Sequence, residues 1–232
     1  MTRPIKSKYS KELFEARAKL IVEEGLFTPL SDTIAKIINK HVRGSAALID
    51  MGCGDGSLLA SICDRIRPNL GVGIDISKEG TIVASKNYTD RIWAVADLAN
   101  TPFKDGRFDV ILNILSPSNY GEFNRLLKAD GLVVKVVPQS SHLKELRQTI
   151  FKDNERQSYS NANTVERFNN NFQVTAHSKL RYTVALNHSS IRSLIQMTPL
   201  AWTMTEEQAK PLLAEKSAHI TVDLEILAGK KN

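Results

Sequence analysis

A glycine-rich loop at residues 50–56, DMGCGDG, has the residue types and spacing best suited to ligand chemistry. Glycines accept positive φ angles and carry no Cβ, so a ligand can approach the main chain of such a loop closely. Between a strand and a helix, this kind of loop is typical of nucleotide-like cofactor sites. The alternatives are a tight turn without a ligand and a dinucleotide site, whose G-x-G-x-x-G spacing differs from the spacing here. The loop residues predicted to contact a cofactor are Asp50, Gly52, Gly54, Asp55 and Gly56.

Two aspartates later in the chain each end an apolar run that predicts a strand. Asp75 lies about 20 residues beyond the glycines, where a carboxylate can accept hydrogen bonds from both ribose hydroxyls of a cofactor. Capping the next helix is the other role open to Asp75, although Ser77 can do that instead. Asp97 ends the following strand. Together with the glycine loop, these residues predict a ligand crevice at the carboxyl ends of parallel strands.

The pattern around these residues predicts strands that alternate with helices, which is typical of a mostly parallel sheet. Short apolar runs bounded by turn residues predict strands at 46–49, 70–75, 92–96, 108–114 and 132–137. The last third of the chain differs, with predicted strands at 172–177, 180–185 and 220–227 and a helix at 189–198. We therefore expect an α/β, Rossmann-like fold with a mostly parallel seven-stranded sheet and helices on both faces.

Two amphipathic helices are predicted ahead of the first strand. The first runs from Ser10, a candidate N-cap, to about residue 24, where Gly25 is a natural stop. The second covers residues 31–40 and places isoleucines on its inner face. We expect residues 1–44 to form an N-terminal helical cap and residues 45–232 to form the cofactor-binding domain.

Composition narrows the class of protein. The formal net charge of +6 favours a polyanionic partner such as nucleic acid, or else reflects an unspecialised basic surface. The two cysteines, Cys53 and Cys63, form no CxxC pair, so we expect no cysteine-rich zinc site or other metal. Free thiols, a polar N-terminal segment and the lack of a 20-residue apolar run predict a cytoplasmic protein without a membrane partner. The sequence leaves a homodimer open as an assembly.

The glycine loop resembles motif I of the class I S-adenosylmethionine-dependent methyltransferases, in which the loop faces the methionine and ribose of the cofactor. More narrowly, the chain is similar to the RlmA type of large-subunit (23S) rRNA guanine-N1 methyltransferases. The P-x-x-x-H-L segment at 138–143 and the M-T-P-x-A-W segment at 197–202 are the specific ones, since generic methyltransferases lack them. The other similar segments are 15–18, 24–30, 50–56, 73–78 and 115–117.

This resemblance implies S-adenosylmethionine as cofactor, ribosomal RNA as partner and methyl transfer to N1 of a guanine. Small-molecule methylation by the same fold is the alternative, and cofactor binding without activity is a third. The family pattern places cofactor contacts at Phe27 and His142 besides the loop, although from the residues alone Phe27 would be a core aromatic and His142 a helix cap. Phe27 stands in place of a tyrosine and so lacks its hydroxyl. In related enzymes an acidic residue at the position of Asp97 approaches the adenine; otherwise Asp97 is a cap or turn residue, and Leu98 or Ala99 supplies a backbone contact instead. Ile76 is expected as a further cofactor contact.

The chain also departs from the family pattern. The family carries an N-terminal four-cysteine zinc module, whereas this sequence has no cysteines to build one; a natural short form, a truncated chain or a paralogue with another substrate are the alternatives. Asn113 replaces a basic residue before an aromatic pair. Related enzymes position the acceptor after the fourth strand, which predicts Asn113, Ser116 and Pro117 as acceptor-side residues, Asn113 being otherwise a turn residue. Trp202 either stacks on a base or lies in the core.

Overall fold

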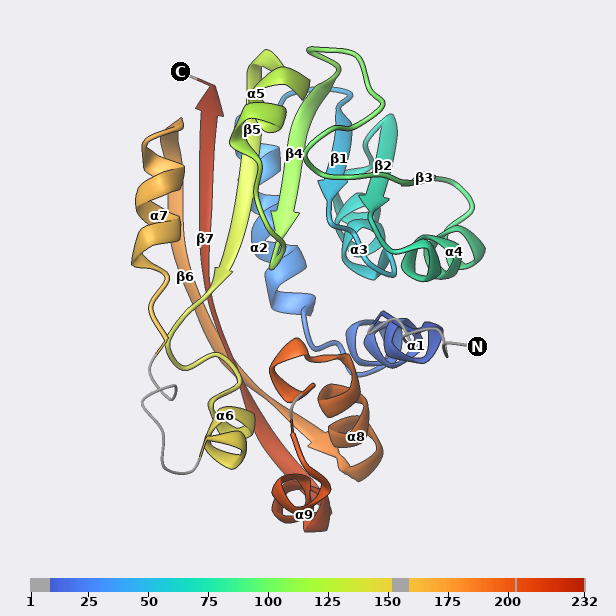
Figure 1. The fold of residues 1–232 in the computed structure, drawn as a ribbon. Helices are drawn as coiled ribbons and strands as arrows, with labels where there is room; N and C mark the ends of the chain where they lie inside the picture. The colour runs from blue at the N-terminus through green and yellow to red at the C-terminus, as the bar shows by residue number, and fades with distance from the viewer. Residues whose placement is uncertain (1–8, 152–158, 203, 232) are drawn as a thin grey trace, which may run out of the picture.

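Five buried apolar runs form the parallel part of the sheet in the computed structural model, which describes residues 9–151, 159–202 and 204–231. These strands are β1 (Ala47–Met51), β2 (Leu70–Asp75), β3 (Ile92–Val95), β4 (Phe108–Ile114) and β5 (Leu127–Pro138). The full strand order is β3-β2-β1-β4-β5-β7-β6, and the first five strands are parallel to one another (Figure 1). The predicted seven-stranded, mostly parallel Rossmann-like fold is confirmed.

The last two strands are antiparallel and longer than the others. β6 (Phe172–Asn187) pairs with β7 (Ser217–Lys231), and β7 pairs with β5. The prediction of two separate strands at 172–177 and 180–185 is wrong, because one strand runs through both segments with a register shift between Val174 and Ala176. Ser178 and Lys179, between the two predicted segments, pair in register with Ile226 and Glu225, so pairing with the long strand β7 keeps β6 continuous where the local alternation breaks.

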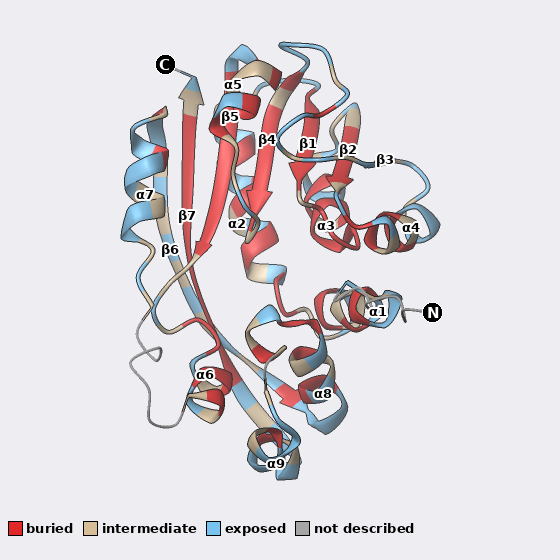
Figure 2. Ribbon diagram, viewed as in Figure 1, coloured by how far each residue is buried: buried red, intermediate tan, exposed pale blue. Residues whose placement is uncertain are grey.

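Helices cover both faces of the sheet. On one face, α2 (Thr28–His41) and α3 (Ser57–Ile66) share an apolar core with the even-numbered residues of β4 and β5. On the other face, α5 (Tyr120–Leu126) and α7 (Ala162–Asn169) share a core with Ile49, Ile111 and Val133. Figure 2 shows the central strands β1, β4 and β5 buried along most of their length. The carboxyl ends of these strands are therefore held in place by well-packed cores on both faces of the sheet.

A second group of helices surrounds the part of β6 and β7 that runs past the other strands (Figure 1). These helices are α6 (Lys144–Ile150), α8 (His188–Met197) and α9 (Glu206–Ala214). A 3-10 turn at Pro199–Ala201 lies between α8 and α9. α8 also contacts α1 (Lys11–Ala18), which continues as a π-helical turn at Lys19–Glu23, and α1 contacts α4 (Lys78–Asn87). This extension faces the carboxyl ends of the parallel strands, so a space is enclosed between them. The helices α7 and α9 lack counterparts in the predicted pattern.

Within the described ranges, no helix combines the length and the apolar character that a membrane crossing requires.

Candidate active site

A cavity of about 1240 Å³ opens at the carboxyl ends of β1, β2, β4 and β5. Its walls come from α1, the glycine loop, the segment after β4, α6 and the turn at residues 197–202. Most of the predicted site residues line it: Phe27, Gly52, Gly54, Asp75, Ile76, Asp97, Leu98, Ser116, Pro117 and His142. The other predicted residues, Asp50, Asp55, Gly56 and Asn113, lie behind this wall.

The glycine loop is tied to the next strand by main-chain hydrogen bonds. The amides of Gly52 and Cys53 both donate to the carbonyl oxygen of Ile74, each at 2.9 Å. Gly52 has a φ of +94°, and a Cβ on it would lie 2.7 Å from the Cβ of Ser116. The loop thus lies directly against the segment after β4, and glycine is needed here for both its conformation and its small size.

The carboxylate of Asp75 links the glycine loop to the segment before α4, with one oxygen bonded to each. Oδ2 accepts a hydrogen bond from the amide of Gly54 at 2.9 Å, and Oδ1 accepts one from the amide of Ser77 at 2.8 Å. The hydroxyl of Ser77 caps α4 by accepting from the amide of Gly80, so the carboxylate of Asp75 is not needed as the helix cap. Each carboxylate oxygen can accept further bonds, which leaves capacity toward the cavity. This is the arrangement that a ribose-binding carboxylate needs.

Asp55 is fully buried and connects the loop to α1. Its Oδ1 accepts from Nε of Arg17 at 2.8 Å, and its Oδ2 accepts from the hydroxyl of Ser57. Burial raises the pKa of Asp55 against the opposing effect of Arg17. Asp50 is buried too, and burial raises its pKa to about 7; its Oδ1 has no hydrogen-bond partner among the described residues. Both carboxylates are thus held inside the loop, and Asp55 is neutralised by its ion pair with Arg17.

His142 faces the cavity as a neutral ring. Its Nδ1 accepts from the amide of Asp223 at 3.3 Å, which assigns the ring proton to Nε2. Burial, assisted by the charge of Arg147, lowers the pKa of His142 to about 4. At neutral pH the ring therefore offers an N–H donor to a ligand. Phe27 lines the same cavity and is almost fully buried, at the residue before α2.

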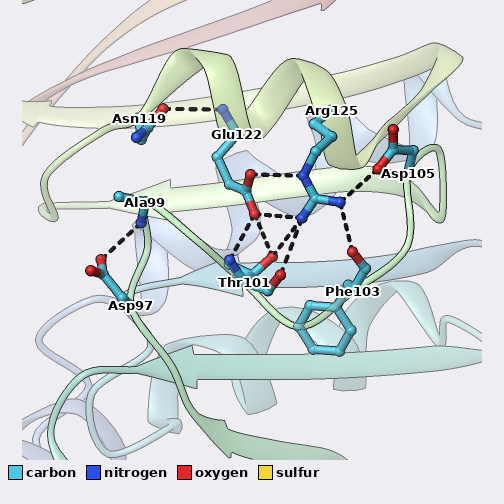
Figure 3. A network of polar contacts seen from close by, with 8 residues as sticks. All are labelled: Asp97, Ala99, Thr101, Phe103, Asp105, Asn119, Glu122 and Arg125. Carbon is cyan, nitrogen blue, oxygen red and sulfur yellow. Dashed lines mark hydrogen bonds and ion pairs between the residues drawn. The ribbon is translucent and has the colours of Figure 1, made fainter.

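The segment that carries Asp97 and Leu98 is held by a partly buried polar network (Figure 3). Asp97 closes the turn by accepting from the amide of Ala99 at 2.9 Å. Glu122 on α5 accepts from the amide and hydroxyl of Thr101, at 2.9 and 2.6 Å, and from Arg125. Arg125 in turn donates to the carbonyl oxygen of Phe103 and the carboxylate of Asp105. The contacts of Glu122 and Arg125 fix the position of the segment, and Asp97 has one carboxylate oxygen engaged by the amide of Ala99.

Glu122→Gln is expected to lower the free energy of unfolding by about 2 kcal/mol at neutral pH, because charged hydrogen bonds are lost. Arg125 first, and Thr101 next, lower the pKa of Glu122 from 4.5 to about 2. The lower folded-state pKa makes the contribution complete above about pH 4.5 and lost as the pH falls toward 2. Urea unfolding at a series of pH values would measure it. Glu166→Gln, at an exposed position on α7, is the control; equal losses in both variants at pH 7 would refute the prediction.

The buried side chain of Asn113 is hydrogen-bonded to residues 117 and 118 of the segment after β4. It is fully buried, and its Nδ2 donates to the carbonyl oxygens of Met51 and Pro117, both at 2.9 Å. Its Oδ1 accepts from the hydroxyl of Ser118 and from Nζ of Lys135. The amide is thus occupied by protein partners, while Ser116 and Pro117 face the cavity. A base-edge contact of Asn113 would require those bonds to open.

Three features of the cavity wall were not predicted from the sequence. Arg17 is one of several charged residues on an amphipathic helix, and nothing local marks it. Lys135 interrupts the apolar run at 132–137, and that interruption was the available signal. Tyr9 lies edge-on to Trp202 with ring centroids 5.3 Å apart and stacks on Phe14, so Trp202 is both a wall residue and part of an aromatic cluster.

Comparisons with known proteins agree with this geometry. A family model described as "Methyltransferase domain" matches residues 49–134. The Bacillus subtilis protein named "Putative 23S rRNA (guanine-N(1)-)-methyltransferase YxjB" is 48% identical over 236 residues, covering 100% of this chain and 84% of that protein. The "23S rRNA (guanine(748)-N(1))-methyltransferase" of Streptomyces fradiae is 27% identical over 207 residues, covering 88% and 73%.

Solved structures with low sequence identity share the fold. Geranyl diphosphate methyltransferase in complex with SAM aligns with a TM-score of 0.52 at 15% identity, covering 86% of this chain and 85% of that chain. The YcgJ protein from Bacillus subtilis aligns with a TM-score of 0.55 at 16% identity, covering 87% and 97%. The fold and the site define a class I S-adenosylmethionine-dependent methyltransferase. The chain belongs to the RlmA-type 23S rRNA guanine-N1 methyltransferase family.

The residues of the cavity fit S-adenosylmethionine. Gly52 and Gly54 present bare main chain, and Asp75 keeps acceptor capacity beside them. Ile76 is largely exposed and lines the cavity with Leu98, where both would offer an apolar surface to a purine ring. The volume of about 1240 Å³ exceeds the roughly 300–1,000 Å³ of a typical small-molecule pocket, so there is room for a cofactor and part of an acceptor.

Proposed function

We propose that this enzyme methylates N1 of a guanine base in 23S ribosomal RNA, which would place it in the cytoplasm. The observation that carries the proposal is the 48% identity, along the whole of this chain, to the Bacillus subtilis protein named for that activity. The Streptomyces fradiae relative named for the same chemistry supports it. The matched segments include the residues that line the cavity at 138–143 and 197–202.

The charge of the protein is consistent with a polyanionic acceptor. The formal net charge is +6, which favours association with nucleic acid over small neutral molecules. Arg147 lines the cavity near His142 and forms no ion pair with a carboxylate among the described residues. Its guanidinium lies 5.3 Å from the ring of Tyr159, and its Nε has no hydrogen-bond partner within the part of the chain that the structure describes. A phosphate group of the acceptor would complement this charge.

For methyl transfer the protein mainly has to align the acceptor nitrogen with the methyl group and exclude water. The cofactor supplies a methyl group activated by its sulfonium. Asp75 and His142 would bind and orient it, and the segment with Ser116 and Pro117 would place the acceptor base. Methyl transfer would form the N1–carbon bond at the expense of the carbon–sulfur bond of the cofactor, and the proton of guanine N1 would pass to solvent.

Incubation with unmodified 23S rRNA and cofactor carrying a labelled methyl group tests the proposal. We expect the label in RNA, and nucleoside mass spectrometry should identify it as N1-methylguanosine. The activity should decline as salt rises, because phosphate contacts release counterions. Labelled RNA without N1-methylguanosine would refute the position. Absence of labelled RNA at low salt, in a protein that still binds the cofactor, would refute the RNA substrate and favour a small-molecule acceptor.

A further inference from the structure

Lys135 is a buried cation at the acceptor side of the cavity. It lies in the middle of β5, only 3% exposed, directly across from Asn113 on β4 and Leu227 on β7. Its Nζ donates to Oδ1 of Asn113 and, at 2.6 Å, to the carbonyl oxygen of Ser116. No carboxylate in the described part of the chain forms an ion pair with it. A buried charge without a counter-charge is costly, so it is kept only where something else requires it.

Both acceptors of Lys135 belong to one structural unit. Asn113 bonds the carbonyl oxygen of Pro117, and Ser116 lies between them, so Lys135 and Asn113 together hold residues 113–118. Leu115 within this segment has a φ of +53°, a conformation that side chains other than glycine adopt only when the surroundings impose it. The lysine therefore stabilises the segment that would place the acceptor. An ammonium group has three N–H donors, and two are used here.

We propose that Lys135 acts as a fixed cation that holds the acceptor segment and donates its remaining N–H to the carbonyl oxygen beside the attacking nitrogen of the acceptor. The proposal rests on the proposed guanine-N1 acceptor. When N1 loses its proton, the negative charge is shared with the neighbouring carbonyl oxygen O6, and a cation there stabilises that charge. The side chain lines the same cavity as Ser116 and Pro117, which places it on the acceptor's side.

The surroundings of Lys135 decide its charge state. The side chains directly across from it on β4 and β7, Asn113 and Leu227, carry no charge, and the segment after β4 offers it the carbonyl oxygen of Ser116. Glu225, two residues along β7 from Leu227, is hydrogen-bonded to Gln139, Asn161 and His177. The titratable groups that line the wider cavity include Arg17, Asp75, Asp97, His142 and Arg147. Burial lowers the pKa of Lys135 to about 8. The cation thus predominates at pH 7 and is lost as the pH rises through about 8, whereas an arginine in its place stays charged.

Lys135→Met should lower kcat by about 10²-fold, as expected when one donor to a developing charge is removed. Calorimetric affinity for S-adenosylmethionine should not change, because the cofactor contacts are elsewhere. Lys135→Arg should keep most of the activity. The matched control is Lys128→Met, which removes an exposed lysine from the same strand and should leave kcat unaltered. Full activity in Lys135→Met would overturn the proposal.

The pH dependence separates a cation from a general base. The ratio of the wild-type kcat to that of Lys135→Arg cancels the ionisation of the substrate, and it should fall as the pH rises above about 8. A ratio that rises through this range would assign Lys135 as a proton acceptor and overturn the cationic role. Hydrogen–deuterium exchange should be faster at 113–118 in Lys135→Met than in Lys128→Met; equal exchange would overturn the holding role. If the wild type methylates no guanine N1, the proposed function fails, and this exchange comparison still decides whether Lys135 holds the segment.

Discussion

Gly56→Ala is expected to lower the free energy of unfolding by about 2–4 kcal/mol, the sum of strain at a positive φ and overpacking. Gly56 has a φ of +77°, and a Cβ there would lie 2.7 Å from Cζ3 of Trp93 and 2.9 Å from the Cβ of Ala84. The ring of Trp93 cannot easily move aside, because its Nε1 donates to the carbonyl oxygen of Tyr88 at 2.7 Å. Urea unfolding would measure the loss.

A matched glycine separates the two causes. Gly44 has a φ of +79°, and a Cβ added to it would meet nothing within 4 Å. Gly44→Ala should therefore show only the conformational cost, about 1–2 kcal/mol. If both variants lose the same stability, contact with Trp93 contributes nothing and this account of the loop is wrong. Trp93→Leu in the Gly56→Ala background should recover part of the loss.

Asp75→Ala should weaken S-adenosylmethionine binding by about 1–3 kcal/mol, roughly a 5- to 150-fold rise in Kd, through lost charged hydrogen bonds. Part of the effect should come from the protein itself, because Asp75 also accepts from the amides of Gly54 and Ser77. Titration calorimetry at pH 7 measures the affinity. An unchanged Kd in a folded variant would remove Asp75 from the cofactor site.

Two further variants sharpen the interpretation of Asp75. Asp75→Asn keeps the shape and one acceptor oxygen but loses the charge, so it should fall between the wild type and Asp75→Ala. Asp130→Ala removes an exposed aspartate from β5 and serves as the control for a general change in charge. Equal weakening of cofactor binding in Asp130→Ala and Asp75→Ala would point to long-range electrostatics instead of a direct contact.

Much of this molecule follows from local pattern. The strands β1 to β5 and the helices between them arise from short apolar runs and turn residues, whose effect is local. Once the strands are parallel, their carboxyl ends meet at one edge, so Gly54, Asp75 and Asp97 come to one cavity without further information. The resemblance of segments 138–143 and 197–202 to the family extended the predicted site to His142 and to the part of the cavity wall formed by residues 197–202.

Contacts between residues far apart in the chain could not be predicted in the same way. Local alternation broken near Ser178 predicts two strands, whereas pairing with β7 makes one. Asn113 has the residue type of an acceptor contact, yet its neighbours in space use every part of its amide.

The sequence by itself determined the glycine loop, the strand-end carboxylates and the family, because these depend on residue type and spacing along the chain. Only the tertiary structure decided that Arg17 reaches Asp55 across 38 positions and that Lys135 reaches Asn113 and Ser116 from the neighbouring strand. The physical reason is that strand register and helix packing determine which groups surround a buried charge. Which oxygens surround Lys135 is therefore a property of the packed sheet.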